Sequence, residues 1–409
     1  MSTATSARTT GYVISHYLLT YLGYYGLVAT LVVTLTAASF TGPQVALLVM
    51  VFTLTNKVAN IPLAPWLERI PAANSVLLGC LMAASGFVCL QFATGMPLTI
   101  FSLAFAGVGI SINALASKQL AAAASDRTGN RARLFSLVSI AVNTAAAVAA
   151  PVALMFIERE QQGSVLWAVA AVYCLAGIVT FSRRAILELA DRKGPAASPR
   201  VFLTILRLPG VRSFLIINFF YWFLYGQLFN VLAVHVSKTL DSPGRLGWLY
   251  ALNALMVVFL QLSVTHLAQR WTSGQELLTV VRAYALFVVS FMMVYLIPGY
   301  LGAVVFVVVF TIAEMMFVPS ADVHFLGLIG HGNRAVGYSV FAISTALGEA
   351  LGGGAGIAAH RWLTDHGFGH QFWLGTAVVA LLFTLLTQGL RRSSTGLVHA
   401  APGRVRVGD

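Results

Sequence analysis

The chain has 409 residues, of which 58% are apolar and only 9% charged. Ordinary soluble domains carry roughly 25% charged residues, so a water-soluble surface of this size is excluded and most of the surface must face lipid. The formal net charge is +12, but Lys and Arg stand singly or in pairs between apolar runs, which argues against nucleic-acid binding. All three cysteines, Cys80, Cys89 and Cys174, lie inside apolar runs, which argues against a disulfide framework.

Twelve apolar runs are long enough to cross a membrane, which takes about 20 helical residues. In chain order the predicted spans are 11–38, 43–66, 74–93, 97–123, 133–157, 163–185, 211–239, 245–267, 277–297, 299–326, 333–358 and 368–390. The first run is too long for a cleaved signal peptide, so we expect the first helix to be retained. The predicted domains are an N-terminal six-helix bundle (1–185), a cytoplasmic linker (186–210), a C-terminal six-helix bundle (211–392) and a cytoplasmic tail (393–409).

The distribution of basic residues predicts the orientation. If both termini are cytoplasmic, only four of the 25 Lys and Arg residues fall on the outer side, and two more lie inside helices. The outer four are Arg159, Lys238, Arg245 and Arg361, and the helical two are Lys57 and Lys118. Positive charge is enriched on the cytoplasmic side of membrane proteins, so the sequence predicts cytoplasmic termini, which an even number of spans also requires.

The two halves of the chain repeat each other. The segment from Gly129 begins GNRARLFS and the segment from Gly332 begins GNRAVGYS, at an offset of 203 residues. In the first helix of each half, Tyr21 and Tyr25 correspond to Tyr221 and Tyr225, at an offset of 200. A parallel repeat of six and six helices resembles the architecture of the Major Facilitator Superfamily.

Local motifs carry the same resemblance. The loop after the second span, Ala64 to Ala73, contains Glu68-Arg69 and resembles the superfamily signature G-x-x-x-D-R-x-G-R/K. Helix 10 reads TIAEMMFVPSAD and resembles the corresponding segment of the twelve-helix drug:proton antiporters, which are multidrug or metabolite exporters of the cell inner membrane. The resemblance implies a cytoplasmic gate at Glu68 and Arg69, to which Lys118 at the cytoplasmic end of helix 4 is added.

Three acids of the second half are candidates for proton coupling. Glu314 and Glu349 lie near the middle of helices 10 and 11, where burying a charge costs at least about 2.5–3.5 kcal/mol. A carboxyl group in such surroundings can exchange a proton near neutral pH; the alternative is a neutral Glu hydrogen-bonded to a neighbouring helix. Asp322 is the third candidate, although its place at the cytoplasmic end of helix 10 favours an ion pair with the gate.

A lysine in the middle of helix 2 predicts a polar cavity. Lys57, preceded by Asn56, must face water or pair with an acid. It would contact an anionic substrate group, pair with Glu314 or Glu349 across the cavity, or form a purely structural ion pair.

Aromatic and amide side chains in helices 1 and 7 indicate the cavity wall, because helices 1, 4, 7 and 10 line the cavity in the superfamily that the chain resembles. Asn218, Tyr221, Trp222 and Tyr225 follow helical spacing and could share one face; the alternative is an interfacial aromatic belt. The complete predicted lining is Lys57, Asn56, Tyr21, Tyr25, Asn113, Asn218, Tyr221, Trp222, Tyr225 and Gln227. The Gly352-Gly353-Gly354 run in helix 11 predicts close helix packing.

These features predict a secondary transporter that expels a small amphipathic molecule by proton-coupled alternating access. The alternatives are a dedicated exporter of an anionic metabolite, such as a carboxylate siderophore, and an uptake carrier of the same superfamily. No nucleophile elbow, phosphate loop or metal-ligand spacing occurs in the sequence, so we expect no enzyme activity, catalytic residues, metal or cofactor. The expected partners are the substrate, protons and the lipid bilayer, and we expect a monomer.

Overall fold

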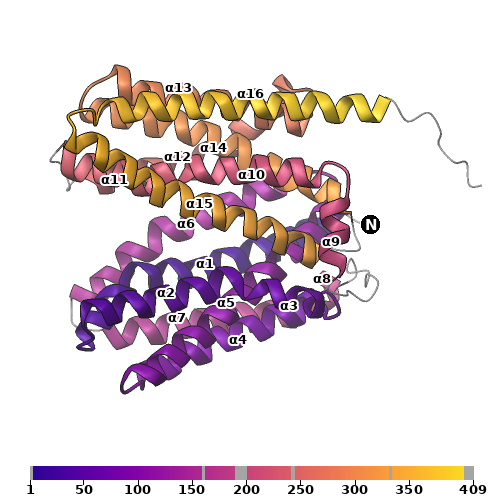
Figure 1. Cartoon of the computed structure of the whole chain (residues 1–409). Helices are drawn as coiled ribbons and strands as arrows, with labels where there is room; N and C mark the ends of the chain where they lie inside the picture. Colours follow the sequence, from indigo (N-terminus) through magenta and orange to yellow (C-terminus); the bar gives the residue numbers. More distant parts are fainter. Residues whose placement is uncertain (1–2, 159–161, 189–199, 241–244, 331–333, 400–409) are drawn as a thin grey trace, which may run out of the picture.

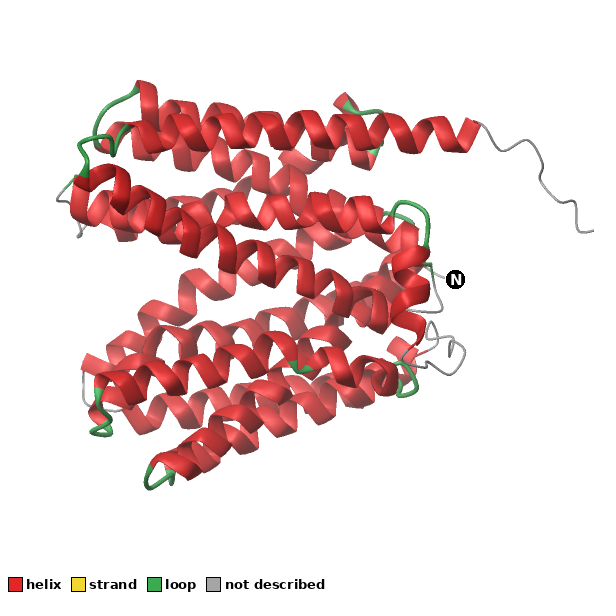
Figure 2. Ribbon diagram, in the orientation of Figure 1, coloured by secondary structure: helices red, strands yellow, loops and turns green. Residues whose placement is uncertain are grey.

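A computed structural model describes residues 3–158, 162–188, 200–240, 245–330 and 334–399. These residues are almost entirely helical, and no strand occurs among them (Figure 2). Helices are expected because lipid offers no hydrogen-bond partner to the backbone, so each segment that crosses it must satisfy its own N–H and C=O groups. Twelve helices in the described part of the chain are long and apolar enough to cross a membrane, which confirms the predicted all-α membrane fold.

The first half supplies six of these spans. Its helices are α1 (Thr3–Ala37), α2 (Gly42–Val58), α3 (Asn60–Leu67), α4 (Ala72–Gln91), α5 (Met96–Thr128), α6 (Arg131–Glu158), α7 (Gln162–Ser182) and the short α8 (Arg184–Glu188). The second predicted span is divided into α2 and α3 at Ala59, a turn that the continuous hydropathy does not indicate.

The second half supplies the other six spans. Its helices are α9 (Arg200–Arg207), α10 (Val211–Gly226), the π-helix η1 (Gln227–Val231), α11 (Leu232–Val234), the π-helix η2 (His235–Thr239), α12 (Leu246–Trp271), α13 (Glu276–Leu296), α14 (Tyr300–Ile329), α15 (Arg334–Asp365) and α16 (Gln371–His399). The seventh span, Val211–Val234, thus consists of α10, η1 and α11. π-Helical turns inside membrane helices are rare, and hydropathy gave no sign of them.

The predicted linker contains one helix that the sequence did not indicate. Helix α9 packs against α10 and α15, and its Ile205 is fully buried. Eight residues cannot cross a bilayer, so α9 is a short helix packed on the second half and not a further span. Residues 189–199 of the linker and 400–409 of the tail lie outside the described residues, and the predicted domain boundaries and membrane orientation stay predictions.

The helices form two bundles, α1–α8 and α9–α16, which Figure 1 shows one above the other. The bundles meet through contacts of α6 with α12 and α14, and of α15 with α2, α3 and α5. The start of α1, helices α8 and α9 and the end of α16 all lie at one end of the molecule, where the bundles converge (Figure 1). We call this the closed end. At the opposite end the two sets of ribbons diverge.

The two bundles have different cores. In the first, α4 and α5 are nearly in backbone contact: a Cβ at Gly79 would lie 2.6 Å from the backbone nitrogen of Asn113. In the second, stacked aromatic side chains fill the centre, such as Tyr221 on Phe317, whose ring centroids are 3.7 Å apart. Two of the three glycines in the run on α15 serve packing as predicted: a Cβ at Gly352 would lie 2.1 Å from the carbonyl oxygen of Phe223 and one at Gly353 2.7 Å from Nδ2 of Asn230, whereas nothing lies within 4 Å of one at Gly354.

Candidate functional site

Glu68 joins the two halves at the closed end. It follows α3, and its carboxylate oxygen Oε2 accepts the backbone N–H groups of Ala335 at 2.7 Å and Val336 at 3.2 Å. These are the first free N–H groups of α15, and the N-terminus of a helix carries a partial positive charge that favours an anion. Arg69 is exposed in the turn after α3, where its backbone N–H donates to the carbonyl oxygen of Trp66.

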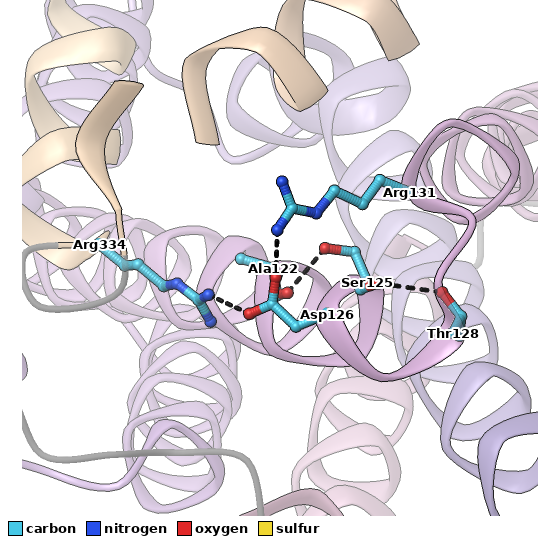
Figure 3. Close-up of polar contacts among 6 residues, drawn as sticks. All are labelled: Ala122, Ser125, Asp126, Thr128, Arg131 and Arg334. Atoms are coloured by element: carbon cyan, nitrogen blue, oxygen red, sulfur yellow. Dashed lines mark hydrogen bonds and ion pairs between the residues drawn. The ribbon is translucent and has the colours of Figure 1, made fainter. Parts of the chain in front are cut away.

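Asp126 at the end of α5 binds two arginines (Figure 3). Nη2 of Arg131 lies 2.9 Å from its Oδ1, and Arg334 at the start of α15 pairs with its Oδ2. The two arginines hold the same position in the repeated GNRA segments, so residues related by the repeat converge on one carboxylate. Sequence reasoning found the repeat but missed Asp126, although an acid three residues before the first GNRA was the available signal.

Lys118 and Asp322 form a third connection between the halves. Nζ of Lys118 on α5 lies 2.7 Å from both carboxylate oxygens of Asp322 on α14. The same Nζ lies 5.9 Å from the ring centres of Phe135 and Tyr338, close enough for cation–π attraction. This is the ion pair that the position of Asp322 favoured; its role as a gate, like a role for Asp322 in proton coupling, stays a prediction.

Exchanging the two charges tests this pair. Lys118→Gln leaves buried Asp322 without its cation, which costs up to about 3 kcal/mol, and should lower both the transport rate and the unfolding temperature. We expect the double variant Lys118→Asp/Asp322→Lys to recover part of both, because the attraction is restored while the cation–π contacts are not. Transport in vesicles and thermal unfolding in detergent provide the two measurements. The single variants Lys118→Asp and Asp322→Lys provide the comparison. If the double variant is as impaired as the sum of these two, the two side chains do not act as a pair.

Lys57 lies midway between the two ends of the bundles and pairs with Glu349. Its Nζ is 3.5 Å from Oε2 of Glu349, and each side chain is 40% exposed. The pair joins α2 to α15. One predicted alternative for Lys57 was an ion pair with Glu314 or Glu349, and the structure has the pair with Glu349. Asn56 donates to the hydroxyl of Tyr24 at 3.4 Å and thereby connects α2 to the tyrosines of α1.

Glu314 is buried in the middle of α14, with only 6% of its surface exposed. Its Oε2 accepts a hydrogen bond from Nδ2 of Asn253 on α12 at 2.9 Å, and its Oε1 accepts one from the hydroxyl of Tyr225 on α10 at 3.3 Å. None of the ion pairs found among residues 3–158, 162–188, 200–240, 245–330 and 334–399 involves Glu314. Sequence reasoning missed Asn253, whose signal was an amide in an otherwise apolar stretch of its span.

Half-buried aromatic side chains surround these acids. Tyr21, Tyr24 and Tyr25 on α1 contact one another with ring centroids 5.5–6.1 Å apart. On α10, Trp222 and Tyr225 are in edge contact at 4.8 Å. Aromatic walls with a few polar groups suit an amphipathic ligand.

Four predicted lining residues lie inside the bundles instead. Tyr221 packs on Phe317, as described above, and the other three bind neighbouring helices through hydrogen bonds. Nδ2 of Asn218 donates to Ser344 and Thr345, Nε2 of Gln227 donates to the carbonyl oxygen of Gly352, and Oδ1 of Asn113 accepts from Cys80. All four are at most 4% exposed. As substrate contacts they stay a prediction.

The connections between the halves are unevenly distributed along the molecule. Within the described ranges, every hydrogen bond or ion pair between the halves lies at Lys57 or nearer to the closed end, including one between Ser136 and Thr265 at 2.8 Å. At the opposite end an apolar cavity of about 720 Å³ lies between α1 and α2. No cluster of three metal-binding side chains occurs among the residues described.

Two repeated helical bundles, joined at one end and carrying buried polar groups midway, define a membrane transporter. The chain belongs to the Major Facilitator Superfamily, whose family model matches residues 13–353. It is 24% identical over 315 residues to the multidrug resistance protein MdtH of Enterobacter sp. (strain 638), covering 73% of this chain and 72% of that one. This likeness agrees with the predicted drug-exporter branch.

Solved structures share the fold. The human organic anion transporter MFSD10 (TETRAN) superposes with a TM-score of 0.73 at 15% identity, covering 93% of this chain and 99% of that one. A bacterial homologue of the iron transporter ferroportin, in an outward-facing state, gives a TM-score of 0.75 at 13% identity, covering 94% and 99%. At these identities the likeness shows the fold alone.

Proposed function

We propose that this multi-pass membrane transporter expels a small amphipathic molecule from the cytoplasm in exchange for protons. The closed end is then the cytoplasmic end, and the structure is an outward-open conformation in the inner membrane of a bacterium. Twelve spans with the start of α1 and the end of α16 at one end support this orientation, together with the excess of Lys and Arg predicted for that side. The multidrug-resistance name of the 24% identical relative supports the direction and the substrate class.

The observation that carries the proposal is the buried carboxyl of Glu314. An ionised carboxylate buried without a cation costs several kcal/mol, so we propose that Glu314 carries a proton in this conformation. When the halves rock and the site opens to the cytoplasm, water reaches the carboxyl and the proton leaves. Tyr225 contacts Glu314 and also faces the aromatic wall, so a bound substrate and the proton act on the same polar network. Exchange follows if each weakens the binding of the other.

A second function, transport of an anion together with a proton, is favoured by the Lys57–Glu349 pair. An anion bound at Lys57 would replace Glu349, whose carboxylate would lose its cation and bind a proton more readily. Binding of the anion and binding of the proton would then favour each other. In exchange, by contrast, each weakens the binding of the other.

The direction of flux under an imposed pH gradient separates the two functions. In proteoliposomes acidic inside, exchange predicts that an amphipathic substrate such as ethidium accumulates inside as protons leave, whereas cotransport predicts that an organic anion loaded inside is driven out with them. The protonophore carbonyl cyanide m-chlorophenylhydrazone should abolish the gradient-driven part in either case. If the flux is the same with the vesicles acidic inside and acidic outside, proton coupling is refuted.

A further inference from the structure

The cavity at the open end is lined almost entirely by hydrocarbon. Six of its lining residues are Val32, Thr36 and Phe40 from the α1 side and Val49, Met50 and Leu54 from α2. The hydroxyl of Thr36 donates to the carbonyl oxygen of Val32 at 2.8 Å, so that side chain presents chiefly its methyl group. A volume of about 720 Å³ lies within the range of roughly 300–1,000 Å³ typical of small-molecule pockets.

The cavity lies on the face of α2 that is turned toward the second half. The opposite face packs on α5, because a Cβ at Gly107 would lie 2.0 Å from the hydroxyl of Thr55. Residues four apart share a helix face, so Val49, Thr53 and Lys57 form one stripe that runs from the cavity to the lysine. Lys57 ends this stripe by reaching Glu349 on α15.

The apolar surface of α1 and α2 becomes polar at the level of Lys57. On α1, the cavity residue Val32 is followed on the same face by Val28, which is 46% exposed, and then by Tyr24. The hydroxyl of Tyr24 accepts a hydrogen bond from Asn56, the neighbour of Lys57. An apolar cavity therefore continues into a place with one cation, a phenol and an amide.

We propose that this continuous surface binds an amphipathic organic anion, with its apolar chain in the cavity between α1 and α2 and its carboxylate on Nζ of Lys57 in place of Glu349. The present ion pair is long, at 3.5 Å, and each side chain is 40% exposed; exposed pairs of this kind bind weakly, so an incoming carboxylate can displace it. The proposal names a substrate class for the second function, transport of an anion together with a proton, and rests on that function only in taking the cavity as part of the transport path.

The length of the surface indicates a chain of medium length. From Val45, at the far limit of the cavity, to Lys57 the axis of α2 rises about 18 Å. Decanoate is the probe we choose, with butyrate as an acid too short to fill the cavity. Decanol has the same chain without a charge, and decyltrimethylammonium carries the opposite charge.

Equilibrium binding to the purified chain in phosphatidylcholine nanodiscs tests the proposal. We expect radiolabelled decanoate to bind at least about tenfold more tightly than butyrate, and to be displaced by unlabelled decanoate but not by decanol or decyltrimethylammonium at equal concentration. Lys57→Gln should weaken decanoate binding about tenfold or more, while Lys57→Arg should retain most of it. The double variant Lys57→Gln/Glu349→Gln, which leaves no unpaired charge, should weaken it equally.

A pair of matched variants on α2 tests the cavity itself. Leu54 lines it and is 54% exposed, whereas Leu47 is 41% exposed on the same helix but is not part of the lining. Leu54→Gln should weaken the binding of decanoate several-fold and leave that of butyrate unchanged. Leu47→Gln should change neither. Each variant is first checked for an unchanged elution volume and unfolding temperature.

Several results would overturn the inference: equal affinity for decanoate and decanol, decanoate binding that is indifferent to Lys57→Gln, or equal effects of the two leucine variants. Loss of decanoate binding when phosphatidylglycerol replaces part of the nanodisc lipid would assign the site to a bilayer lipid instead of a substrate. Because binding is measured without any gradient, it does not depend on proton coupling. Gradient-driven flux of ethidium without decanoate binding would refute only the inference, and the reverse result only the proposed exchange.

Discussion

Glu314→Gln should abolish proton-driven transport while the protein still folds. Glutamine has the same shape and its side-chain oxygen can accept the hydrogen bond from Asn253 or Tyr225, so the change in the free energy of unfolding should be below about 1 kcal/mol. The amide neither binds nor releases a proton at the pH of the experiment, so a pH gradient no longer biases the two conformations through this site. We expect gradient-driven flux in proteoliposomes to fall at least about tenfold, toward the level of empty vesicles.

The internal control for this variant is the swap of labelled for unlabelled substrate across the membrane in the absence of a pH gradient. This swap of one substrate molecule for another needs no net movement of protons. It should continue in Glu314→Gln at a rate close to that of the unaltered chain. Asp365→Asn, which removes an exposed acid at the end of α15, should leave gradient-driven flux unchanged. Full proton-driven flux in Glu314→Gln would exclude Glu314 as the coupling site. Glu349 and Asp322 would then be the remaining candidates for proton coupling.

Arg334→Gln should shift the protein toward the conformation in which the closed end opens. Arg334 connects α15 to Asp126 across the two halves, and its side chain is only 8% exposed. Loss of a charged hydrogen bond of this kind costs roughly 1.5–3 kcal/mol, which corresponds to about a 10- to 150-fold change in the ratio of the two conformations. Distances between spin labels on α5 and α14 at the closed end would measure this shift directly.

Arg131→Gln is the matched control for Arg334→Gln. Arg131 occupies the equivalent position in the first half and also bonds to Asp126, yet this bond stays within one bundle. Its loss should lower the unfolding temperature slightly but leave the spin-label distances nearly unchanged. Equal shifts in the two variants would mean that Asp126 acts only by supporting the end of α5, and not as a connection between the halves.

The fold was largely predictable because lipid imposes a simple rule on the sequence. Apolar runs of about 20 residues mark spans, and all twelve appear near their predicted limits. The short helix α9 was missed because its eight residues fall in a segment with many charges. The division at Ala59 and the π-helical turns after Gly226 were missed because apolar sequence is compatible with all of these helical forms.

The candidate site was less predictable, because hydropathy does not determine how a membrane helix is rotated. Asn218 and Tyr221 share the spacing of Trp222 and Tyr225, yet the structure turns the first two into the C-terminal bundle. A helix that is apolar on all sides offers no polar face from which to choose. Partners on other helices could not be predicted either, because tertiary packing alone brings them together. Asn253 contacts Glu314 in this way, and Asp126 contacts Arg334.

The contact between Glu68 and α15 couples the opening of the closed end to the stability of a helix terminus. The first N–H groups of α15 find their acceptor on the other half of the molecule. When the halves separate there, the helix loses this cap, and losing a cap costs about 0.5–2 kcal/mol. The first turn of α15 is therefore more stable as a helix while the end is closed than after it opens. The energy difference between the two conformations then includes the fraying of a helix terminus, so the stability of one helical turn contributes to how often the transporter opens.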